Sequence, residues 1–492
     1  MFRPIHATDG IRAIERAAAG AVPPLMARAG LAAAEYARRI MSESARSVLV
    51  VAGPGNNGGD AFEVATHLKR WFYRVGVVFA GERGKLPRDA LAALGKWEAA
   101  GGALDKGIAP GGRWDLVIDG LFGIGLQRAL AGRYAELVAA MNALGAPILS
   151  LDVPSGLNAD TGAVMGAAIR ASHTVTFIAL KPGLLTLDGP DCCGEVHVED
   201  LGLSLKSREQ AGGCLIDESA VTAAVSRRPS NFHKGLAGNV TVLGGAEGMV
   251  GAAVLAGRAA LKCGAGRVHL ALLAESAPAH DAIQPELMRR APDALIEGEA
   301  MTVIAAGPGL GRSERAGMLL LRALESVAPL VLDADALNAL AENAMLRDCL
   351  IGRAGRSVLT PHPAEAARLL GCATREVQAD RIAAAQRIAA RYRAPVALKG
   401  NGTVVASPDG RWWINPTGNA GMAAAGMGDV LTGIIAGLIA QGAPALDALC
   451  AGVWLHGAAG DAVAKTNGGP LGLTASDLID QARSILNRVV YR

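Results

Sequence analysis

Short apolar runs that stop at glycine-rich or acidic turns recur along the whole chain. The run at 47–52 is continuous and rich in β-branched residues, as in a strand buried on both faces of a parallel sheet, and it stops at the glycine-rich segment 53–60. Helical patterns such as 88–100, 134–144 and 249–263 lie between such runs. This alternation predicts doubly wound α/β sheets with ligand sites at the carboxyl ends of the strands. The other predicted strands are 75–80, 114–119, 148–151, 173–177, 239–243, 267–272, 302–306, 330–332, 357–359 and 394–398.

The chain has 492 residues, which is long for one hydrophobic core and predicts two or three domains. The most linker-like stretch is 204–213, which is polar and ends in two glycines. We therefore expect one domain at 1–207, with covering helices between 8 and 36, and a second at 214–492.

Composition excludes several classes of function. No uninterrupted run of about eighteen apolar residues suggests a membrane span, and the amino terminus lacks the pattern of a secretory signal. A net charge of +3 without a basic and aromatic cluster argues against nucleic acid and for small-molecule partners. Seven cysteines without zinc-ligand spacing predict a reducing, cytoplasmic setting.

The segment 418–433, GNAGMAAAGMGDVLTG, carries the clearest chemical signal. Gly426, Met427, Gly428 and Asp429 precede the apolar run 430–439, so free amides at a helix N-terminus would attract a phosphate. Asp429 in the first helical turn would accept a proton from a nearby hydroxyl, which indicates phosphoryl transfer. The alternative is an ordinary helix cap.

Polar segments also end the strands of the first half. The segment 53–60 is neither a dinucleotide fingerprint nor a P-loop, but its Asn carbonyls, with Asp119 and Ser155, would form an oxygen cage for a cation. Simple turn chemistry is the alternative for such a segment. Asp152 is the candidate acid or base, although it would also suit a cap on the turn at 155–156. We expect the helix after 53–60 to begin near Ala61.

Three motifs in the first half, PGNNGGDA, DGLFGIGLQR and LDVPSGLNADTG, resemble the epimerase domain of the bifunctional NAD(P)H-hydrate repair enzymes. The resemblance covers about residues 8–207 and implies a Rossmann-like three-layer sandwich. It implies that Asn57, Asp119 and Ser155 hold K⁺. It also implies that the hydrated cofactor is bound by Asn56, Asn57, Gly58, Gly59, Asp60, Gly123, Ile124, Gly125, Leu126, Gln127, Arg128, Ala129 and Asp152.

Motifs of the second half resemble the ribokinase-like dehydratase of the same enzymes, over about residues 214–488. They are HKGLAGNVTVLGG, AAGPGLG, LDADALN, TPHPAE, LKGNGTVV and GNAGMAAAGMGDVLTG. The resemblance implies nucleotide contacts from Lys399, Gly400, Asn401, Gly402, Thr403 and Gly428. It implies hydrate contacts from Ala253 in the turn 251–253, Gly309, His362 and Asp429. From the residues alone, His362 suits a structural role, Asp333 and Asp335 suit a helix cap, and Lys399 suits a solvated turn.

The resemblance implies that the first domain interconverts the R and S epimers of hydrated NADH or NADPH. The second would dehydrate the S epimer with Mg²⁺ and ADP or ATP, through a phosphorylated intermediate. We expect a homo-oligomer. Two alternatives remain at this stage. One is a ribokinase-like small-molecule kinase, similar to hydroxyethylthiazole or pyridoxine kinases, with a non-catalytic first half. The other keeps the second activity beside a degenerate first half. The choice between ADP and ATP, and between NADH and NADPH hydrate, is left open.

Overall fold

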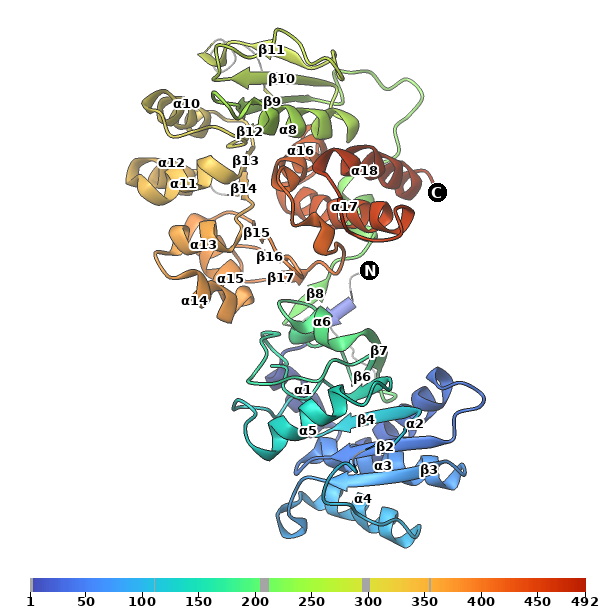
Figure 1. The fold of residues 1–492 in the computed structure, drawn as a ribbon. Coiled ribbons are helices and arrows are strands. Elements are labelled where there is room, and N and C mark those ends of the chain that lie inside the picture. Colours follow the sequence, from blue (N-terminus) through green and yellow to red (C-terminus); the bar gives the residue numbers. More distant parts are fainter. Residues whose placement is uncertain (1–2, 110, 204–211, 294–300, 354) are drawn as a thin grey trace. The chain divides into compact units, whose positions relative to one another are not determined.

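The computed structural model describes residues 3–109, 111–203, 212–293, 301–353 and 355–492, and the chain divides into two compact units (Figure 1). The N-terminal unit comprises residues 4–212 and the C-terminal unit residues 213–492 together with the first three residues. Most of the predicted linker, 204–211, lies outside the described residues. In the described part of the chain, no helix has the length and hydropathy of a membrane span.

The N-terminal unit is built on a parallel sheet with the strand order β3-β2-β4-β5-β6-β7. Alternate side chains of its strands belong to two apolar clusters: Val48 and Val50 pack with α2, α3 and α4, whereas Leu49 and Val51 pack with α5. Helices therefore cover both faces, as the predicted sandwich requires. The elements are β1 Arg3–Ile5, α1 Thr8–Ala17, α2 Leu25–Ile40, β2 Ser47–Ala52, α3 Asn56–Arg70, β3 Arg74–Phe79, η1 Arg83–Lys85, α4 Arg88–Ala99, β4 Leu116–Gly120, α5 Arg133–Asn142, β5 Ile148–Leu151, β6 His173–Phe177, η2 Pro182–Leu184, α6 Gly189–Cys193 and β7 Glu195–Glu199.

The C-terminal unit contains a longer sheet with the strand order β8-β17-β16-β15-β14-β13-β12-β9-β10-β11. Its strands run parallel except for β16, which is antiparallel to both neighbours. The elements are β8 Gly213–Leu215, α7 Ser219–Ala224, β9 Asn239–Gly244, α8 Val250–Lys262, β10 Arg267–Leu272, β11 Met288–Arg290, β12 Val303–Ala306, α10 Glu314–Glu325, β13 Leu330–Leu332, α11 Ala334–Glu342, α12 Ala344–Gly352, β14 Ser357–Leu359, α13 Pro363–Leu370, α14 Thr374–Ala379, α15 Arg381–Tyr392, β15 Val396–Leu398, β16 Val404–Ala406, β17 Trp412–Ile414, η4 Ala420–Met422, α16 Met427–Ala440, α17 Ala445–Thr466 and α18 Ala475–Val490.

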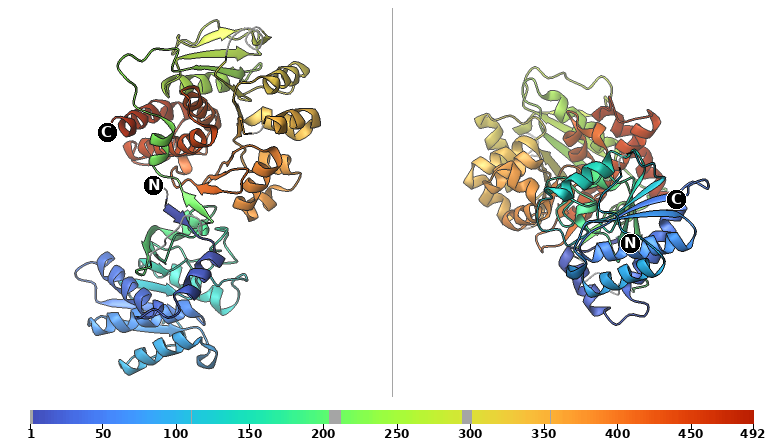
Figure 2. Two further views of the ribbon diagram at one scale, coloured as in Figure 1. Left: turned by 180° about the vertical axis from the view of Figure 1, so that it is seen from behind. Right: turned by 60° about the horizontal axis from the view of Figure 1, so that its bottom comes forward.

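Helices cover both faces of this second sheet as well. The rear view shows the yellow and orange helices α10 to α15 on one side and α8 with the red helices α16, α17 and α18 on the other (Figure 2). The apolar core extends over the second group, where α16 is almost entirely buried between α8 and α17. Burial on all sides explains why the run 430–439 has no polar face.

One helix begins earlier than the sequence indicated. Helix α3 begins at Asn56 rather than near Ala61, so Asn56–Asp60 forms its first turn instead of a loop. Gly58 permits this start, because a Cβ there would lie 2.0 Å from the carbonyl oxygen of Gly53. Helix α8 agrees with the predicted helix 249–263, and it includes 251–253, where the resemblance implied a turn. At Gly58, glycine was interpreted as a turn signal although it allows close packing at a helix N-terminus.

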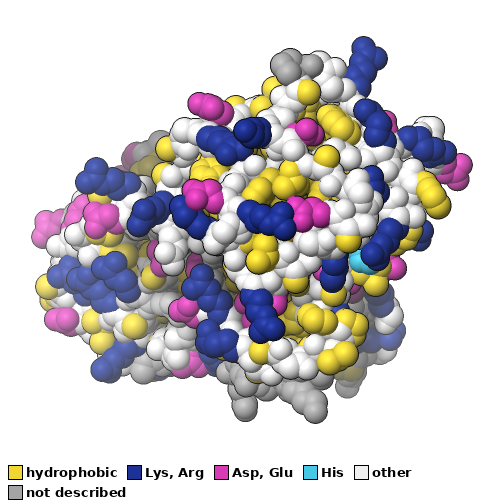
Figure 3. Space-filling model, turned by 90° about the horizontal axis from the view of Figure 1, so that it is seen from below, with side chains coloured by type: hydrophobic (Ala, Val, Ile, Leu, Met, Phe, Trp, Pro, Cys, Tyr) yellow, Lys and Arg dark blue, Asp and Glu magenta, His cyan; other side chains and the backbone are white. Residues whose placement is uncertain are grey.

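Charges are mixed on the face that Figure 3 shows. Lys and Arg side chains are interspersed there with Asp and Glu side chains (Figure 3).

Candidate functional site

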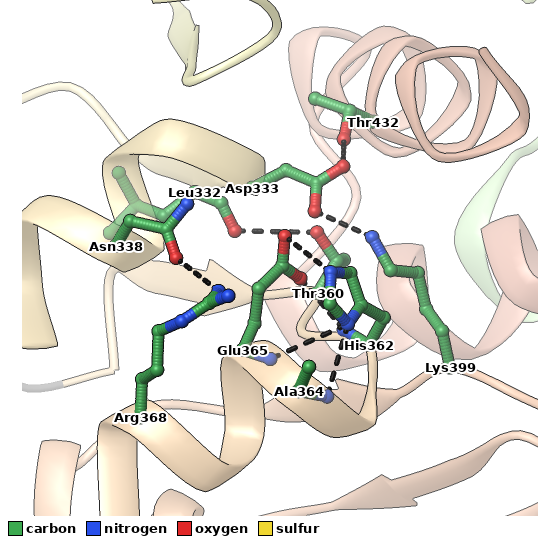
Figure 4. Close-up of polar contacts among 10 residues, drawn as sticks. All are labelled: Leu332, Asp333, Asn338, Thr360, His362, Ala364, Glu365, Arg368, Lys399 and Thr432. Atoms are coloured by element: carbon green, nitrogen blue, oxygen red, sulfur yellow. Dashed lines mark hydrogen bonds and ion pairs between the residues drawn. The ribbon is translucent and has the colours of Figure 1, made fainter. Parts of the chain in front are cut away.

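The ends of strands β13 and β15 bring a carboxylate and an ammonium together in the C-terminal unit. Asp333 follows β13, Lys399 follows β15, and Lys399 Nζ donates to Asp333 Oδ1 at 2.6 Å (Figure 4). The second oxygen of Asp333 accepts a hydrogen bond of 2.9 Å from Thr432 Oγ1 on α16. The ion pair thus joins the sheet edge to the buried helix.

These contacts correct our interpretation of Asp333 and Asp335 as helix caps. The backbone of Asp333 is the N-cap of α11, but its side chain makes no capping hydrogen bond. Asp335 Oδ2 instead accepts the backbone N–H of Gly311 at 2.9 Å, which fixes the turn after β12. Lys399, which we also considered as a solvated turn residue, has a side chain only 20% exposed.

Helix α16 begins directly above this ion pair. Its N-cap, Gly426, has the left-handed φ of 85° that glycine adopts most easily. A Cβ on Gly428 would lie 3.1 Å from Lys399 Nζ and 3.2 Å from Asp333 Oδ2. The first turn of the helix therefore rests on the ion pair, and its backbone N–H groups have no partner within the helix.

Asp429 lies in the first turn of α16 and is partly exposed. Its side chain does not cap the helix and makes no hydrogen bond with another described residue, which argues against the capping alternative. Burial and the nearby Asp333 raise the pKa of Asp429 to about 6, although Lys399 partly offsets them. The carboxyl is thus poised to take a proton near neutral pH.

His362 and Glu365 form a capping box at the start of α13, as Figure 4 shows. Nδ1 of His362 accepts the backbone N–H of Ala364 at 3.1 Å, and Glu365 Oε2 accepts the N–H of His362 at 2.8 Å. Burial and Lys399 lower the pKa of His362, whereas burial raises that of Glu365 to about 7. The structural role of His362 is therefore observed, and its ring is exposed enough to contact a ligand as well.

The predicted hydrate contacts near α8 divide into accessible and buried residues. Gly309 has φ of 58° and packs against Met249, whose carbonyl oxygen would lie 2.6 Å from an added Cβ. Ala253 is 0% exposed in the apolar core, and its contact with the hydrate stays a prediction. Gly251 is exposed and Ala252 is partly exposed, because the helical first turn points them away from the core.

The predicted nucleotide segment is the tight connection between the antiparallel strands β15 and β16. Thr403 Oγ1 donates to the carbonyl oxygen of Gly400 at 3.0 Å and closes the turn. The buried Arg381 donates to the carbonyl oxygens of Leu398 and Lys399 at 3.1 and 3.2 Å. A rigid turn with exposed Gly400 and Asn401 thus lies at the sheet edge.

In the N-terminal unit, Asp152 follows β5 with φ of 66°, an uncommon value for a residue other than glycine. Lys181 Nζ donates to Asp152 Oδ1 at 2.5 Å, to Thr176 Oγ1 at 2.9 Å and to the Phe177 carbonyl oxygen at 2.6 Å. The Lys181 side chain is 0% exposed. These contacts give Asp152 a buried cationic partner in place of the capping role that we also considered.

Asp119 and Ser155 meet at the ends of β4 and β5, and Asn57 lies in the first turn of α3. Asp119 Oδ1 accepts a hydrogen bond of 2.6 Å from the hydroxyl of Ser155, and Asp119 Oδ2 accepts one of 2.8 Å from the backbone N–H of Ser155. Both polar side-chain atoms of Asn57 are buried without a hydrogen-bond partner among the described residues. A buried amide oxygen with no donor and a buried carboxylate with only neutral partners fit a monovalent cation.

Gly123 connects these residues to Asp152. A Cβ on Gly123 would lie 3.2 Å from Asp152 Oδ2 and 3.3 Å from Asn57 Oδ1, so both side chains face the same glycine. The surrounding segment 123–129 is partly or fully exposed. Burial, together with the nearby Asp152, raises the pKa of Asp60 well above its usual range. In the first turn of α3, Asn56 is exposed, whereas Gly58 and Gly59 are buried by packing.

Sequence reasoning missed Lys181, Thr432 and Arg381. Lys181 stands beside the apolar stretch 175–180, and Thr432 is the only polar residue within the run 430–439. A polar side chain in a buried stretch needs a partner, and that signal would have identified both. No local pattern distinguishes Arg381 from other helical arginines.

The fold and these sites define a class of protein in which a Rossmann-like unit accompanies a ribokinase-like phosphoryl-transfer unit. A ribokinase-like superfamily protein from Enterococcus faecalis V583 matches with a TM-score of 0.50 and 25% identity, over 59% of this chain and 99% of that one. The ADP/ATP-dependent NAD(P)H-hydrate dehydratase of Bacillus subtilis, co-crystallised with ATP and Mg²⁺, is 31% identical over 56% of this chain and 98% of its own, with a TM-score of 0.48.

Sequence comparison extends the likeness over both units. The families described as NAD(P)H-hydrate dehydratase and as YjeF-related protein N-terminus match residues 240–483 and 23–183. The bifunctional NAD(P)H-hydrate repair enzyme Nnr of Escherichia coli K12 is 41% identical over 97% of this chain and 93% of its own length. The chain therefore belongs to the family of bifunctional NAD(P)H-hydrate repair enzymes. This confirms the resemblance and the fold class and does not favour the small-molecule kinase.

Proposed function

We propose that the chain restores hydrated NADH and NADPH in two steps, one carried out by each unit. The N-terminal unit interconverts the R and S epimers, and the C-terminal unit dehydrates the S epimer at the expense of ADP or ATP. The observation that carries this proposal is Asp429: a carboxylate without a hydrogen-bond partner among the described residues, at the start of a glycine-capped helix.

Dehydration needs a better leaving group than hydroxide. Asp429 takes the proton of the ring hydroxyl while that oxygen forms a bond to the terminal phosphorus of the nucleotide, and the bond to the shortened nucleotide breaks. The backbone N–H groups of Gly428 and its neighbours stabilise the developing charge. Phosphate then leaves as the ring nitrogen donates its lone pair, and loss of a proton from the adjacent carbon restores the reduced nicotinamide.

The sheet edge supplies the remaining contacts. We assign the nucleotide to Gly428 and the turn from Lys399 to Thr403, and the hydrate to Gly309, His362 and Asp429, beside the exposed start of α8. A bound Mg²⁺ would neutralise the phosphate charge during transfer.

For epimerisation we assign Asp152 as the acid or base. Lys181 occupies Oδ1 of Asp152, which leaves Oδ2, on the side of Gly123, to exchange a proton with the hydrate. The hydrate would lie against Asn56–Asp60 and the segment 123–129. Asn57, Asp119 and Ser155 would hold K⁺, which would supply a fixed positive charge beside this pocket.

The test is recovery of reduced-nicotinamide absorbance from a mixed-epimer preparation of NADH hydrate with Mg²⁺ and either ADP or ATP. Recovery of the whole mixture, faster than unaided epimer exchange, is the expected result and identifies the donor. Recovery that stalls after one epimer would contradict the epimerase assignment, and no recovery with either nucleotide would contradict the dehydratase assignment and favour the small-molecule kinase. Loss of epimer exchange in Asp152→Ala would support the role of Asp152.

Two further parts of the proposal concern the setting of the enzyme. The structure joins none of the seven cysteines, all of which it describes, in a disulfide, and this supports a reducing compartment such as the cytoplasm. A homo-oligomer remains our prediction, and sedimentation of the purified full-length chain tests it.

A further inference from the structure

In the chemistry above, Asp333 has no part and Lys399 enters only as the first residue of the turn assigned to the nucleotide, yet the ion pair that they form lies next to the first turn of α16. Lys399 Nζ and Asp333 Oδ2 both approach Gly428, which is adjacent to Asp429 in the sequence. Thr432, one turn further along α16, donates to Asp333. The pair therefore touches two positions of the helix that carries Asp429.

The charges of Lys399 and Asp333 affect proton transfer because both act on the pKa of Asp429. Burial of Lys399 favours its neutral form, but Asp333 and Glu365 outweigh burial and raise the pKa of Lys399, which keeps it an ammonium. Burial and Asp333 raise the pKa of Asp429, and Lys399 lowers it. The two members of the pair thus act on Asp429 in opposite directions.

We propose that Lys399 and Asp333 are positioning residues that hold the first turn of α16 and balance the charge around Asp429, so that this carboxylate is ionised when the hydrate binds. The inference rests on the proposed dehydratase activity. For Lys399 it replaces the direct nucleotide contact that the family resemblance implies and that the nucleotide assignment above includes; Gly400 to Thr403 keep that assignment.

The geometry favours this role for Lys399. Its ammonium already has a charged partner at 2.6 Å, and its side chain is 20% exposed. The partner, Asp333, is bound from a second side by Thr432. Turning the ammonium toward a phosphate would leave a buried carboxylate without its cation, which is costly.

Other titratable groups also face this cluster. Asp335 on α11 raises the pKa of Asp429, and Glu365 on α13 interacts with Lys399. His362 borders Glu365, and burial lowers the pKa of the enclosed His456 on α17 to about 4, so it is neutral. None of these groups can take the place of Lys399. Its positive charge lowers the pKa of Asp429 and so opposes the rise that burial, Asp333 and Asp335 cause.

The test measures the acid limb of the pH profile of kcat/KM for dehydration by the full-length chain. In Lys399→Met the charge of Asp333 is no longer balanced, so we expect the limb to move up by about one pH unit. In Asp333→Asn the ammonium acts alone on Asp429, so we expect the limb to move down by a similar amount. Loss of packing alone would not move the limb in opposite directions.

A matched control removes another lysine charge from the same unit. Lys262 on α8 pairs with Asp480 on α18 at 3.2 Å, and Lys262→Met should leave the limb in place. Epimer exchange by each variant shows that the rest of the chain is folded, and Asp333→Asn tests the inference independently if Lys399→Met does not fold.

Three results would overturn the inference. The first is an acid limb that does not move in either variant, and the second is an acid limb that moves in the same direction in both. The third is a Lys399→Met variant whose only change is a higher KM for the nucleotide. The last would make Lys399 a direct nucleotide ligand. Failure of the proposed function itself is distinguishable, because the wild-type chain would then show no dehydration at any pH.

Discussion

The two carboxylates assigned to chemistry, Asp429 and Asp152, are held in opposite ways. Asp429 has no hydrogen-bond partner among the described residues and depends on its helix for position. Asp152 is fixed by a fully buried lysine and by a left-handed backbone conformation. The N-terminal unit therefore positions Asp152 through a direct ion pair. In the C-terminal unit, the ion pair contacts the backbone at Gly428, the residue before Asp429.

The difference corresponds to the two reactions. A carboxylate that removes the proton from an attacking hydroxyl needs an accessible oxygen and a pKa near the working pH. One that exchanges a proton with the hydrate during epimerisation needs a fixed orientation first, since a small displacement weakens the transfer.

Asp429→Asn should remove the proton acceptor of the C-terminal unit while keeping the shape of the side chain. We expect kcat for dehydration to fall by about 10²–10⁴-fold, with epimer exchange unchanged. The two activities are measured on the same sample, by absorbance recovery and by epimer ratio. Dehydration that falls less than about tenfold would show that Asp429 is not the acceptor.

Lys181→Met should leave Asp152 largely buried without its cation. Breaking a buried pair of this kind costs about 3–5 kcal/mol, so the N-terminal unit should unfold at lower denaturant concentration and lose epimer exchange. Dehydration of the S epimer should persist. The control is Lys85→Met, which breaks the exposed pair with Glu82 at 2.9 Å and should change stability by about 0–1 kcal/mol. Equal effects of the two variants would contradict the buried-pair interpretation.

The pH profile of dehydration should follow the ionisation of Asp429. Because the raised pKa of Asp429 is about 6, its acceptor form is lost as the pH falls through that value. Dehydration should therefore decline by about tenfold per pH unit below it and level off above it. A flat profile between pH 5 and 7, measured with the S epimer alone, would be inconsistent with Asp429 acting as base.

Asn57→Ala should test the cation site with the smallest expected effect. Loss of one oxygen ligand should weaken K⁺ binding by roughly tenfold, so epimer exchange should need more K⁺ for half-maximal rate. Asn142→Ala, in the same unit but bonded to Ala168 and Arg170, is the control. A rate independent of K⁺ in both the wild type and the variant would argue against the site.

Most of the fold was predictable because the local periodicity of apolar residues indicates where strands and helices form. The strand 47–52 and the parallel alternation agree with the structure. The early start of α3 was not foreseen, because a glycine that breaks a helix in isolation instead admits a close backbone contact here. The burial of Ala253 was not foreseen either, since the face of a helix toward the core depends on what packs against it.

The sequence by itself determined the class of fold, the order of the two units and the identity of the chemical groups. Motifs such as GMGD and VPSG are local, and local backbone chemistry is enough to place a carboxylate at a helix start or a strand end. Only the tertiary structure decided which charges balance which. Lys399 lies 66 residues from Asp333, and Lys181 lies 29 from Asp152. Those pairings arise because parallel strands bring distant chain segments to one edge, where burial makes each unpaired charge costly.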